Sequence, residues 1–271
     1  MDIEEAKIQI LNEIKKIEHQ YQITVIFAVE SGSRLWGIES RDSDFDIRFV
    51  YKRRIIDYLS LQKMKDSINI MMDPFDYAGW DLVKFMNLAN KSNPSALEWL
   101  KADITYIGEE NREQFRLFLN NVNIKNIYHH YRSIAHSNYT KYLKDKKKKT
   151  IKKYLYVMRG IINALYVLKF NQLPPQKLYT AISKVDINNN VKTMLYEIIN
   201  TKITGTLEEE SITSDTEILD SFILEFMMKQ EDHLNYIQTN YSIKPQLPTK
   251  QLNPIFFKEI GFNHQFIHKS K

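Results

Sequence analysis

Residues 30–51 read ESGSRLWGIESRDSDFDIRFVY, and this stretch decides the fold. In its second half apolar and polar side chains alternate, so that Phe45 and Ile47 face one way while Asp44 and Asp46 face the other. That alternation is typical of a half-buried strand. Just upstream, the β-branched run ITVIFAVE predicts a buried strand that ends at the Ser-Gly-Ser turn. The stretch therefore predicts a strand, a short helix or turn, and a second strand that carries carboxylates.

The carboxylates of Asp44 and Asp46 are expected to project from one strand face, roughly 7 Å apart along the backbone. Carboxylates held this close raise each other's pKa unless a cation neutralises them. Oxygen ligands without sulfur favour Mg²⁺ or Mn²⁺ over zinc. A calcium-binding EF-hand loop starting at Asp42 is excluded, because Ile47 and Arg53 stand where that loop needs glycine and glutamate.

The Gly32-Ser33 pair has the chemistry of a phosphate cradle. A strand that ends in Gly-Ser and leads into a short helix directs backbone N–H groups toward one point, and glycine lets an anion approach closely. The Ser33 hydroxyl adds a donor. A cradle just ahead of a metal-binding pair is what a nucleoside triphosphate with its magnesium requires. The alternative is a plain turn with an N-cap serine, followed by an exposed polar strand face.

Composition sets the protein class. The chain has 271 residues, 43% of them hydrophobic, which suffices for a substantial core. It has no cysteine, so disulfides, zinc-thiolate sites and thiol catalysis are excluded. Its net charge of +5 tolerates an anionic partner. We expect a cytoplasmic protein without membrane contact, because the start is amphipathic rather than a secretory signal and no apolar run is long enough to span a bilayer.

The rest of the chain divides into two parts. Residues 2–19 have the spacing of an amphipathic helix, and SINIMMDPFDY predicts a third strand interrupted by Pro74. Asp81 is expected at the N-terminus of the next helix, where the helix dipole favours a carboxylate. From Pro94 onward the pattern is almost wholly helical, and the last thirty residues read as an extended tail ending in a short helix.

Basic and aromatic side chains recur further along the chain. Lys152, Tyr156 and Arg159 are spaced to share one helix face, which either reaches a triphosphate across a cleft or is a solvated face. The lysine-rich run at residues 141–153 is either a solvated loop or a contact for the phosphates of a nucleotide or RNA.

The order of Gly-Ser, short helix and Asp-x-Asp resembles the nucleotidyltransferase superfamily that includes DNA polymerase β. Three blocks are similar to its RlaP-type branch of predicted nucleotidyltransferases linked to RNA repair: residues 30–51, GWDLVKFMNLANKSNPSALEWL and KKYLYVMRGIINALYVLKF. The chain departs from that branch at Leu35, Val83 and Gly160, where a small residue, a basic residue and a proline are usual. These departures lie outside the catalytic pattern.

The resemblance implies an α+β fold, with a small mixed-sheet nucleotidyltransferase domain at residues 1–93. An all-helical substrate- and nucleotide-binding domain with an extended C-terminal tail would follow at residues 94–271. It also implies two Mg²⁺ or Mn²⁺ ions about 3.5 to 4 Å apart. Their ligands would be Asp44, Asp46 and a third carboxylate, Asp76, with Asp73 as the alternative.

The resemblance further implies nucleotide contacts from Gly32, Ser33 and Arg34, with Glu30 either flanking the cradle or pairing with Arg34 or Arg48. The expected enzyme is a nucleotidyltransferase of the EC 2.7.7 type. It would move a nucleoside monophosphate from an NTP such as ATP to a hydroxyl, as on a tRNA or another RNA end, and release pyrophosphate. Two alternatives stay open: nucleotidylation of a partner protein, and a module that binds nucleotide or RNA without turnover.

Overall fold

The computed structural model describes residues 3–144, 150–204 and 216–262. Its strands are β1 (Thr24–Glu30), β2 (Phe45–Lys52), β3 (Ser67–Met72), β4 (Phe75–Asp81) and β5 (Thr105–Ile107). The helices of the first half are α1 (Ile3–Tyr21), α2 (Gly32–Trp36), α3 (Ile55–Tyr58), α4 (Leu82–Asn90), α5 (Pro94–Lys101), α6 (Glu109–Glu113), the 3₁₀ helix η1 (Gln114–Arg116) and α7 (Leu117–Asn120). The later helices are α8 (Ile124–Asn138), the π-helical turn η2 (Tyr139–Leu143), α9 (Ile151–Phe170), α10 (Leu178–Lys184), α11 (Asn189–Ile203), α12 (Glu217–Met228), α13 (Gln230–Asn240) and α14 (Thr249–Ile260).

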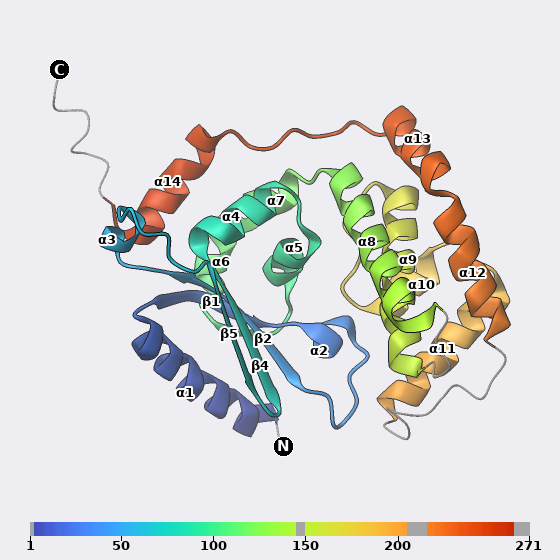
Figure 1. The fold of residues 1–271 in the computed structure, drawn as a ribbon, viewed down its shortest axis with the longest axis horizontal. Coiled ribbons are helices and arrows are strands. Elements are labelled where there is room, and N and C mark those ends of the chain that lie inside the picture. The colour runs from blue at the N-terminus through green and yellow to red at the C-terminus, as the bar shows by residue number, and fades with distance from the viewer. Residues whose placement is uncertain (1–2, 145–149, 205–215, 263–271) are drawn as a thin grey trace.

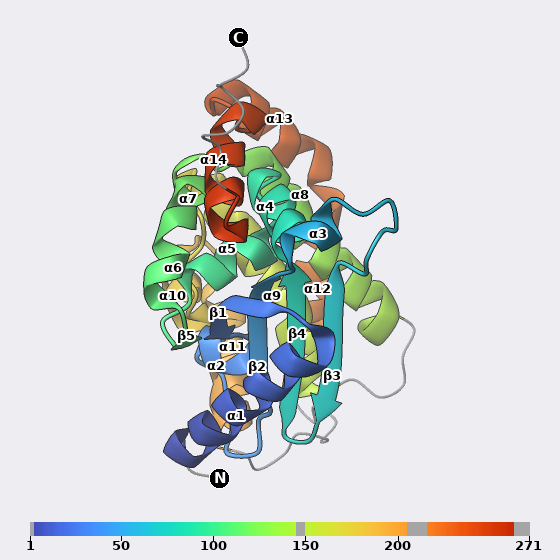
Figure 2. The same ribbon diagram turned by 90° about the vertical axis from the view of Figure 1, so that its left-hand side faces the viewer.

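The strands form one mixed sheet in the order β3-β4-β2-β1-β5. The β2 and β4 strands run parallel, and the other neighbours are antiparallel. Helix α1 covers one face of the sheet, while the other face meets α4 and the helices beyond it (Figures 1 and 2). The predicted α+β architecture, a mixed sheet followed by helices, is confirmed.

Strand β2 has two different faces, as its alternation predicts. Phe45 and Ile47 join the core under α1, together with Ile10 and Ile14. Asp46 and the other polar side chains of β2 point to the opposite face, which is the face turned toward the helices. The strand begins at Phe45, so Asp44, which was expected on the same strand face as Asp46, belongs to the loop before it.

The expected third strand is two strands. Pro74 stands in the turn between β3 and β4, which pair as an antiparallel hairpin. A proline has no N–H to give to a strand ladder, so the turn is where it costs least. Strand β3 lies at the edge of the sheet, and β4 lies beside β2.

The hydrophobic core does not divide at residue 93. Strand β5 lies at residues 105–107 yet pairs with β1, so the sheet takes its last strand from beyond that position. One continuous buried cluster runs from Ile26 on β1 through the long helices α8 and α9 to Leu252 on α14. Among the described helices, none is both long and apolar enough to cross a membrane.

The end of the described chain returns to its beginning. After α13, residues 241–248 run in an extended path back across the molecule, and α14 then packs beside α3 and α4 (Figure 1). The Asn90 side chain donates to the carbonyl of Leu247 at 3.0 Å and accepts from its N–H at 2.8 Å. Lys52 Nζ donates to the carbonyl of Glu259 at 2.5 Å. The segment predicted as an extended tail is therefore fastened to the sheet domain.

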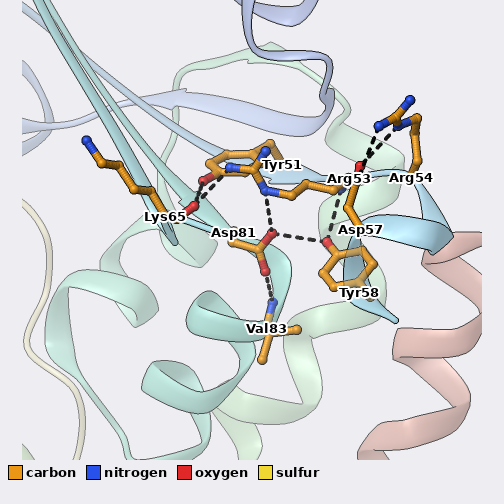
Figure 3. Close-up of polar contacts among 8 residues, drawn as sticks. All are labelled: Tyr51, Arg53, Arg54, Asp57, Tyr58, Lys65, Asp81 and Val83. Atoms are coloured by element: carbon orange, nitrogen blue, oxygen red, sulfur yellow. Dashed lines mark hydrogen bonds and ion pairs between the residues drawn. The ribbon is translucent and has the colours of Figure 1, made fainter. Parts of the chain in front are cut away.

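Asp81 caps helix α4, as predicted for a carboxylate at that helix start. Its side chain is buried and accepts hydrogen bonds from the Val83 N–H at 2.9 Å and the Tyr58 hydroxyl at 3.1 Å (Figure 3). The Arg53 guanidinium lies 3.9 Å away. Burial raises the pKa of Asp81, while the hydrogen bonds and the arginine charge oppose that rise. This carboxylate holds the loop after β2 against α4.

Candidate functional site

A cavity of about 300 Å³ lies between the sheet and the helical region. It is bounded by α2, by the loop and first residues of β2, and by α9 and α11. Its lining residues are Ser31, Gly32, Ser33, Trp36, Ile38, Asp42, Ser43, Asp44, Asp46, Arg48, Lys152, Leu155, Tyr156 and Lys202. The cavity therefore brings together the predicted cradle, two of the predicted metal ligands and two of the predicted nucleotide contacts.

Gly32 and Asp46 are in direct contact at the floor of this cavity. Gly32 has φ +60°, and a Cβ atom built there would lie 1.7 Å from Asp46 Oδ2. The Ser31 N–H donates to the Asp46 carbonyl at 2.9 Å, which fixes the two chain segments together. Only glycine fits, because both the backbone conformation and the space exclude a side chain. As a result, the first N–H groups of α2 lie next to a carboxylate.

The carboxylates differ in their surroundings. Asp44 is exposed at the cavity mouth, whereas Asp46 is half-buried on β2. Burial raises the pKa of Asp46, and the charges of Asp76 and Asp44 add to the rise, while Arg48 and Lys152 oppose it. Asp76 and Asp44 therefore lie close enough to Asp46 for their charges to act on it. Asp76 stands directly opposite Asp46 in the parallel register of β2 and β4.

These residues suit a hard divalent cation by their chemistry. Asp44 and Asp46 offer carboxylate oxygens beside a phosphate-sized space, and Mg²⁺ prefers such ligands together with water and substrate phosphates. Within residues 3–144, 150–204 and 216–262, no three acidic or histidine side chains are grouped closely enough to hold a metal by themselves. Asp46 and Asp76 are instead bridged by Arg48. Asp73, the alternative third carboxylate, is exposed in the β3–β4 turn.

Glu30 lies behind Asp46 and is completely buried. It accepts a hydrogen bond from the Asp46 N–H at 2.9 Å and another from the Tyr106 hydroxyl of β5. Its hydrogen bonds therefore go to Asp46 and Tyr106, in place of the predicted pairing with Arg34 or Arg48. Burial raises the pKa of Glu30 to about 7, although both hydrogen bonds oppose the rise.

The shifted pKa of Glu30 predicts a pH-dependent stability. As pH rises from 4.5 to about 7, the unfolded chain loses the Glu30 proton while the folded chain keeps it. Stability that is present below pH 4.5 is therefore lost across this window, by about 3 kcal/mol. A Glu30→Gln variant should lack this loss. Urea unfolding in EDTA at pH 5 and pH 8 measures the difference, and equal pH dependence in both proteins would contradict the assignment.

Three predicted site residues do not line the cavity. Arg34 stacks on the Phe45 ring, with its Cζ 3.9 Å from the ring centroid, and donates to the Ser43 carbonyl at 2.8 Å. Arg159 is buried behind Trp36, with its Cζ 3.7 Å from that ring, and pairs with Glu98 at 2.5 Å. The third is Asp76, which pairs with Arg48. Each of these side chains interacts with a residue that lies elsewhere in the sequence, so local spacing could not predict the contact.

The predicted helix face splits in the structure. Lys152 and Tyr156 of α9 line the cavity, and the Lys152 charge opposes the rise that burial causes in the pKa of Asp46. Trp36 borders the same cavity and meets Tyr156 edge to face, with ring centroids 6.5 Å apart. Of the three residues predicted to share a helix face, Lys152 and Tyr156 therefore line the cavity, whereas Arg159 is buried behind it. The lysines at residues 146–149 lie outside the described residues.

Lys202 is a cavity residue that the sequence does not reveal. It comes from the last turn of α11, is only 8% exposed, and lines the cavity together with Lys152. Its neighbours in the sequence form an ordinary helix, so spacing gave no sign of a functional position. A positive side chain at a helix C-terminus is favoured by the helix dipole, which is the only local signal.

Comparison with known proteins identifies the family of the chain. Residues 6–256 match the model of a family described as the RNA repair pathway DNA polymerase beta family, RlaP. An uncharacterised Bacillus subtilis (strain 168) protein, YcgL, is 34% identical over 220 residues, which cover 80% of this chain and 84% of that protein.

Among solved structures, the chain matches the crystal structure of a nucleotidyltransferase-like protein from Exiguobacterium sibiricum 255-15. The two chains are 12% identical, and the match covers 91% of this chain and 90% of the other. The TM-score of 0.27 is too low to indicate a shared fold.

Proposed function

We propose, because this chain belongs to the RNA repair pathway DNA polymerase beta family, that it is a metal-dependent nucleotidyltransferase. It would transfer a nucleoside monophosphate from an NTP to a hydroxyl of RNA and release pyrophosphate. The observation that carries the proposal is the contact between Gly32 and Asp46. This contact supports the proposal because a backbone that lets a phosphate approach closely would lie beside a carboxylate that would bind the metal of that phosphate.

The residues of the chain divide the work of this reaction. Gly32 and Ser33 would donate backbone N–H groups, which a helix start leaves without intrahelical acceptors, to the triphosphate. Asp44 and Asp46 would hold Mg²⁺ or Mn²⁺, with Asp76 as the third candidate ligand. When bound, such ions would supply Lewis-acid activation of the acceptor hydroxyl and would neutralise charge on the triphosphate and the leaving pyrophosphate.

The opposite wall of the cavity would hold the rest of the nucleotide. Lys152 of α9 and Lys202 of α11 bring positive charge to the helical side of the cavity. The predicted cradle at Gly32 and Ser33 lines the same cavity from the sheet side. Charge from both sides balances a triphosphate better than charge from one side. Trp36 and Tyr156 supply aromatic surface at the same wall, which suits a base or ribose. Arg159 would support the site by holding Trp36.

RNA is the acceptor that we favour because of the family description, which places its members in RNA repair. Each α-³²P-labelled NTP should be offered with Mg²⁺ or Mn²⁺ to total RNA and, separately, to cell lysate. We expect label in a product that nuclease destroys and protease leaves intact.

Two other outcomes would point elsewhere. Label that survives nuclease and is lost to protease would contradict the RNA acceptor and favour nucleotidylation of a protein. Calorimetry that shows tight binding of NTP with Mg²⁺, but no labelled product over hours, would favour a binding module without turnover.

A further inference from the structure

Arg48 lies between two of the candidate metal ligands. Its Nη2 donates to Asp46 Oδ1 at 2.6 Å and to Asp76 Oδ2 at 2.8 Å, and its Nη1 donates to the Asp76 carbonyl at 2.9 Å. The contacts follow from the sheet. Arg48 is two residues after Asp46 on the same strand face, and Asp76 is the partner of Asp46 on the neighbouring parallel strand.

The two aspartates that Arg48 bridges differ in their exposure to the cavity. Asp46 and Arg48 line the cavity, whereas Asp76 does not. The side chains of Arg48, Asp46 and Asp76 are 17%, 23% and 28% exposed, so the cluster is screened only in part by water. Charge-assisted hydrogen bonds this short are strong, and they occupy one oxygen of each carboxylate. Asp46 keeps its other oxygen, Oδ2, beside Gly32, which lines the cavity.

We infer that Arg48 is a built-in competitor of the divalent metal. In the nucleotide-free protein it holds Asp76 out of metal coordination, so that a metal ion meets Asp44 and Asp46 alone. Asp76 becomes a ligand only when the guanidinium moves off its carboxylate, because two cations on the same oxygens repel each other. This inference rests on the proposed metal site, and it makes Arg48 a positioning residue that sets when the third carboxylate is available.

The hydrogen bond from Arg48 to the Asp76 backbone carbonyl limits how far the guanidinium can move. The bond from Nη1 to the Asp76 carbonyl does not involve either carboxylate, so it anchors the side chain while Nη2 changes partner. A purely structural arginine that clamps β2 to β4 would use the same contacts. Removing a positive charge beside the site tightens metal binding in either role. Only the competitor role predicts that most of this gain requires the Asp76 carboxylate, so a gain that persists in the double variant Arg48→Met with Asp76→Asn would overturn the inference.

The test is Mn²⁺ binding to the nucleotide-free full chain, followed by electron paramagnetic resonance. Arg48→Met should tighten Mn²⁺ binding about tenfold, while Asp76→Asn alone should change it less than about twofold. Asp76→Asn in the Arg48→Met background should remove most of the gain. Arg54→Met is the matched control, because Arg54 pairs with Asp57 at the far end of β2 and should leave Mn²⁺ binding unchanged.

Several results would overturn the inference. One is Mn²⁺ binding that weakens strongly in Asp76→Asn alone, since Asp76 would then already be a ligand. Another is Mn²⁺ binding that is unchanged or weaker in Arg48→Met. If Arg48→Met does not fold, Arg48→Lys replaces it. A lysine has one nitrogen and cannot hold the Asp76 carbonyl and both carboxylates as Nη1 and Nη2 do together, so a smaller gain is expected and no gain would contradict the inference.

The outcome can be separated from that of the proposed function. Mn²⁺ binding needs neither nucleotide nor acceptor, so a protein that transfers no label still gives a readable result. An Asp46→Asn variant identifies the site, because binding that persists in it lies elsewhere. Binding that depends on Asp46 but not on Arg48 would overturn the inference and leave the proposed metal site standing.

Discussion

Replacing Asp46 by asparagine is expected to lower the rate of nucleotide transfer at least about a thousandfold, which corresponds to about 4 kcal/mol of transition-state stabilisation. Asn keeps the size of the side chain and removes the negative charge that a divalent cation needs. Asp46 is also the residue that touches Gly32, so its loss affects the metal and the phosphate cradle together. The rate is measured under single-turnover conditions with labelled NTP.

Two further variants serve as comparisons for Asp46→Asn. Asp73→Asn removes an exposed carboxylate from the β3–β4 turn and should leave the rate unchanged. Asp76→Asn should lower the rate, although it should hardly alter metal binding without nucleotide. Circular dichroism and thermal unfolding show whether each variant is folded. A folded Asp46→Asn protein with wild-type transfer would refute the proposed mechanism.

A Gly32→Ala substitution is expected to lower transfer at least about a hundredfold, because a displacement of about 1 Å at a catalytic group has an effect of this size. The new methyl group would collide with the Asp46 carboxylate, whose Cγ would be only 2.5 Å away. Arg48 holds the other carboxylate oxygen, so the group cannot turn away freely. The left-handed backbone adds about 1 to 2 kcal/mol of destabilisation.

The backbone cost and the collision can be measured separately. Gly261→Ala, at the end of α14, also has a positive φ but places its methyl group where nothing lies within 4 Å. It should lose similar stability in urea unfolding and keep full transfer activity. If Gly32→Ala lost stability to the same extent but transferred at the wild-type rate, the close contact with Asp46 would have no role in the reaction.

The local parts of the fold could be predicted because their causes are local. The alternation of apolar and polar residues around Phe45 specifies β2, and the glycine at position 32 specifies the turn that precedes it. Both depend only on residues that are neighbours in the sequence. Pro74 marked an interruption correctly, but whether it ended one strand or separated two depends on the partner that β3 finds in β4. Strand β5 was missed because three residues carry no periodicity, and its pairing with β1 depends on contacts about 75 residues apart along the chain.

The site was only partly predictable for the same reason. Helical spacing correctly put Lys152 and Tyr156 on one face of α9, but it also put Arg159 there. The structure turns Arg159 into the space behind Trp36, where Glu98 neutralises it. Lys202 enters from α11, about fifty residues later in the chain, and only the packing of α11 beside α9 brings it to the cavity.

The sequence by itself determined the family and marked Gly32, Asp44 and Asp46 as candidate site residues, because each depends on a few adjacent residues and the chemistry of their side chains. Only the tertiary structure decided that Lys202 joins the cavity and that Arg48 stands between Asp46 and Asp76. Periodicity fixes a side chain relative to its own strand or helix. Which neighbour that side chain then meets is settled by the packing of the whole core, which no local pattern contains.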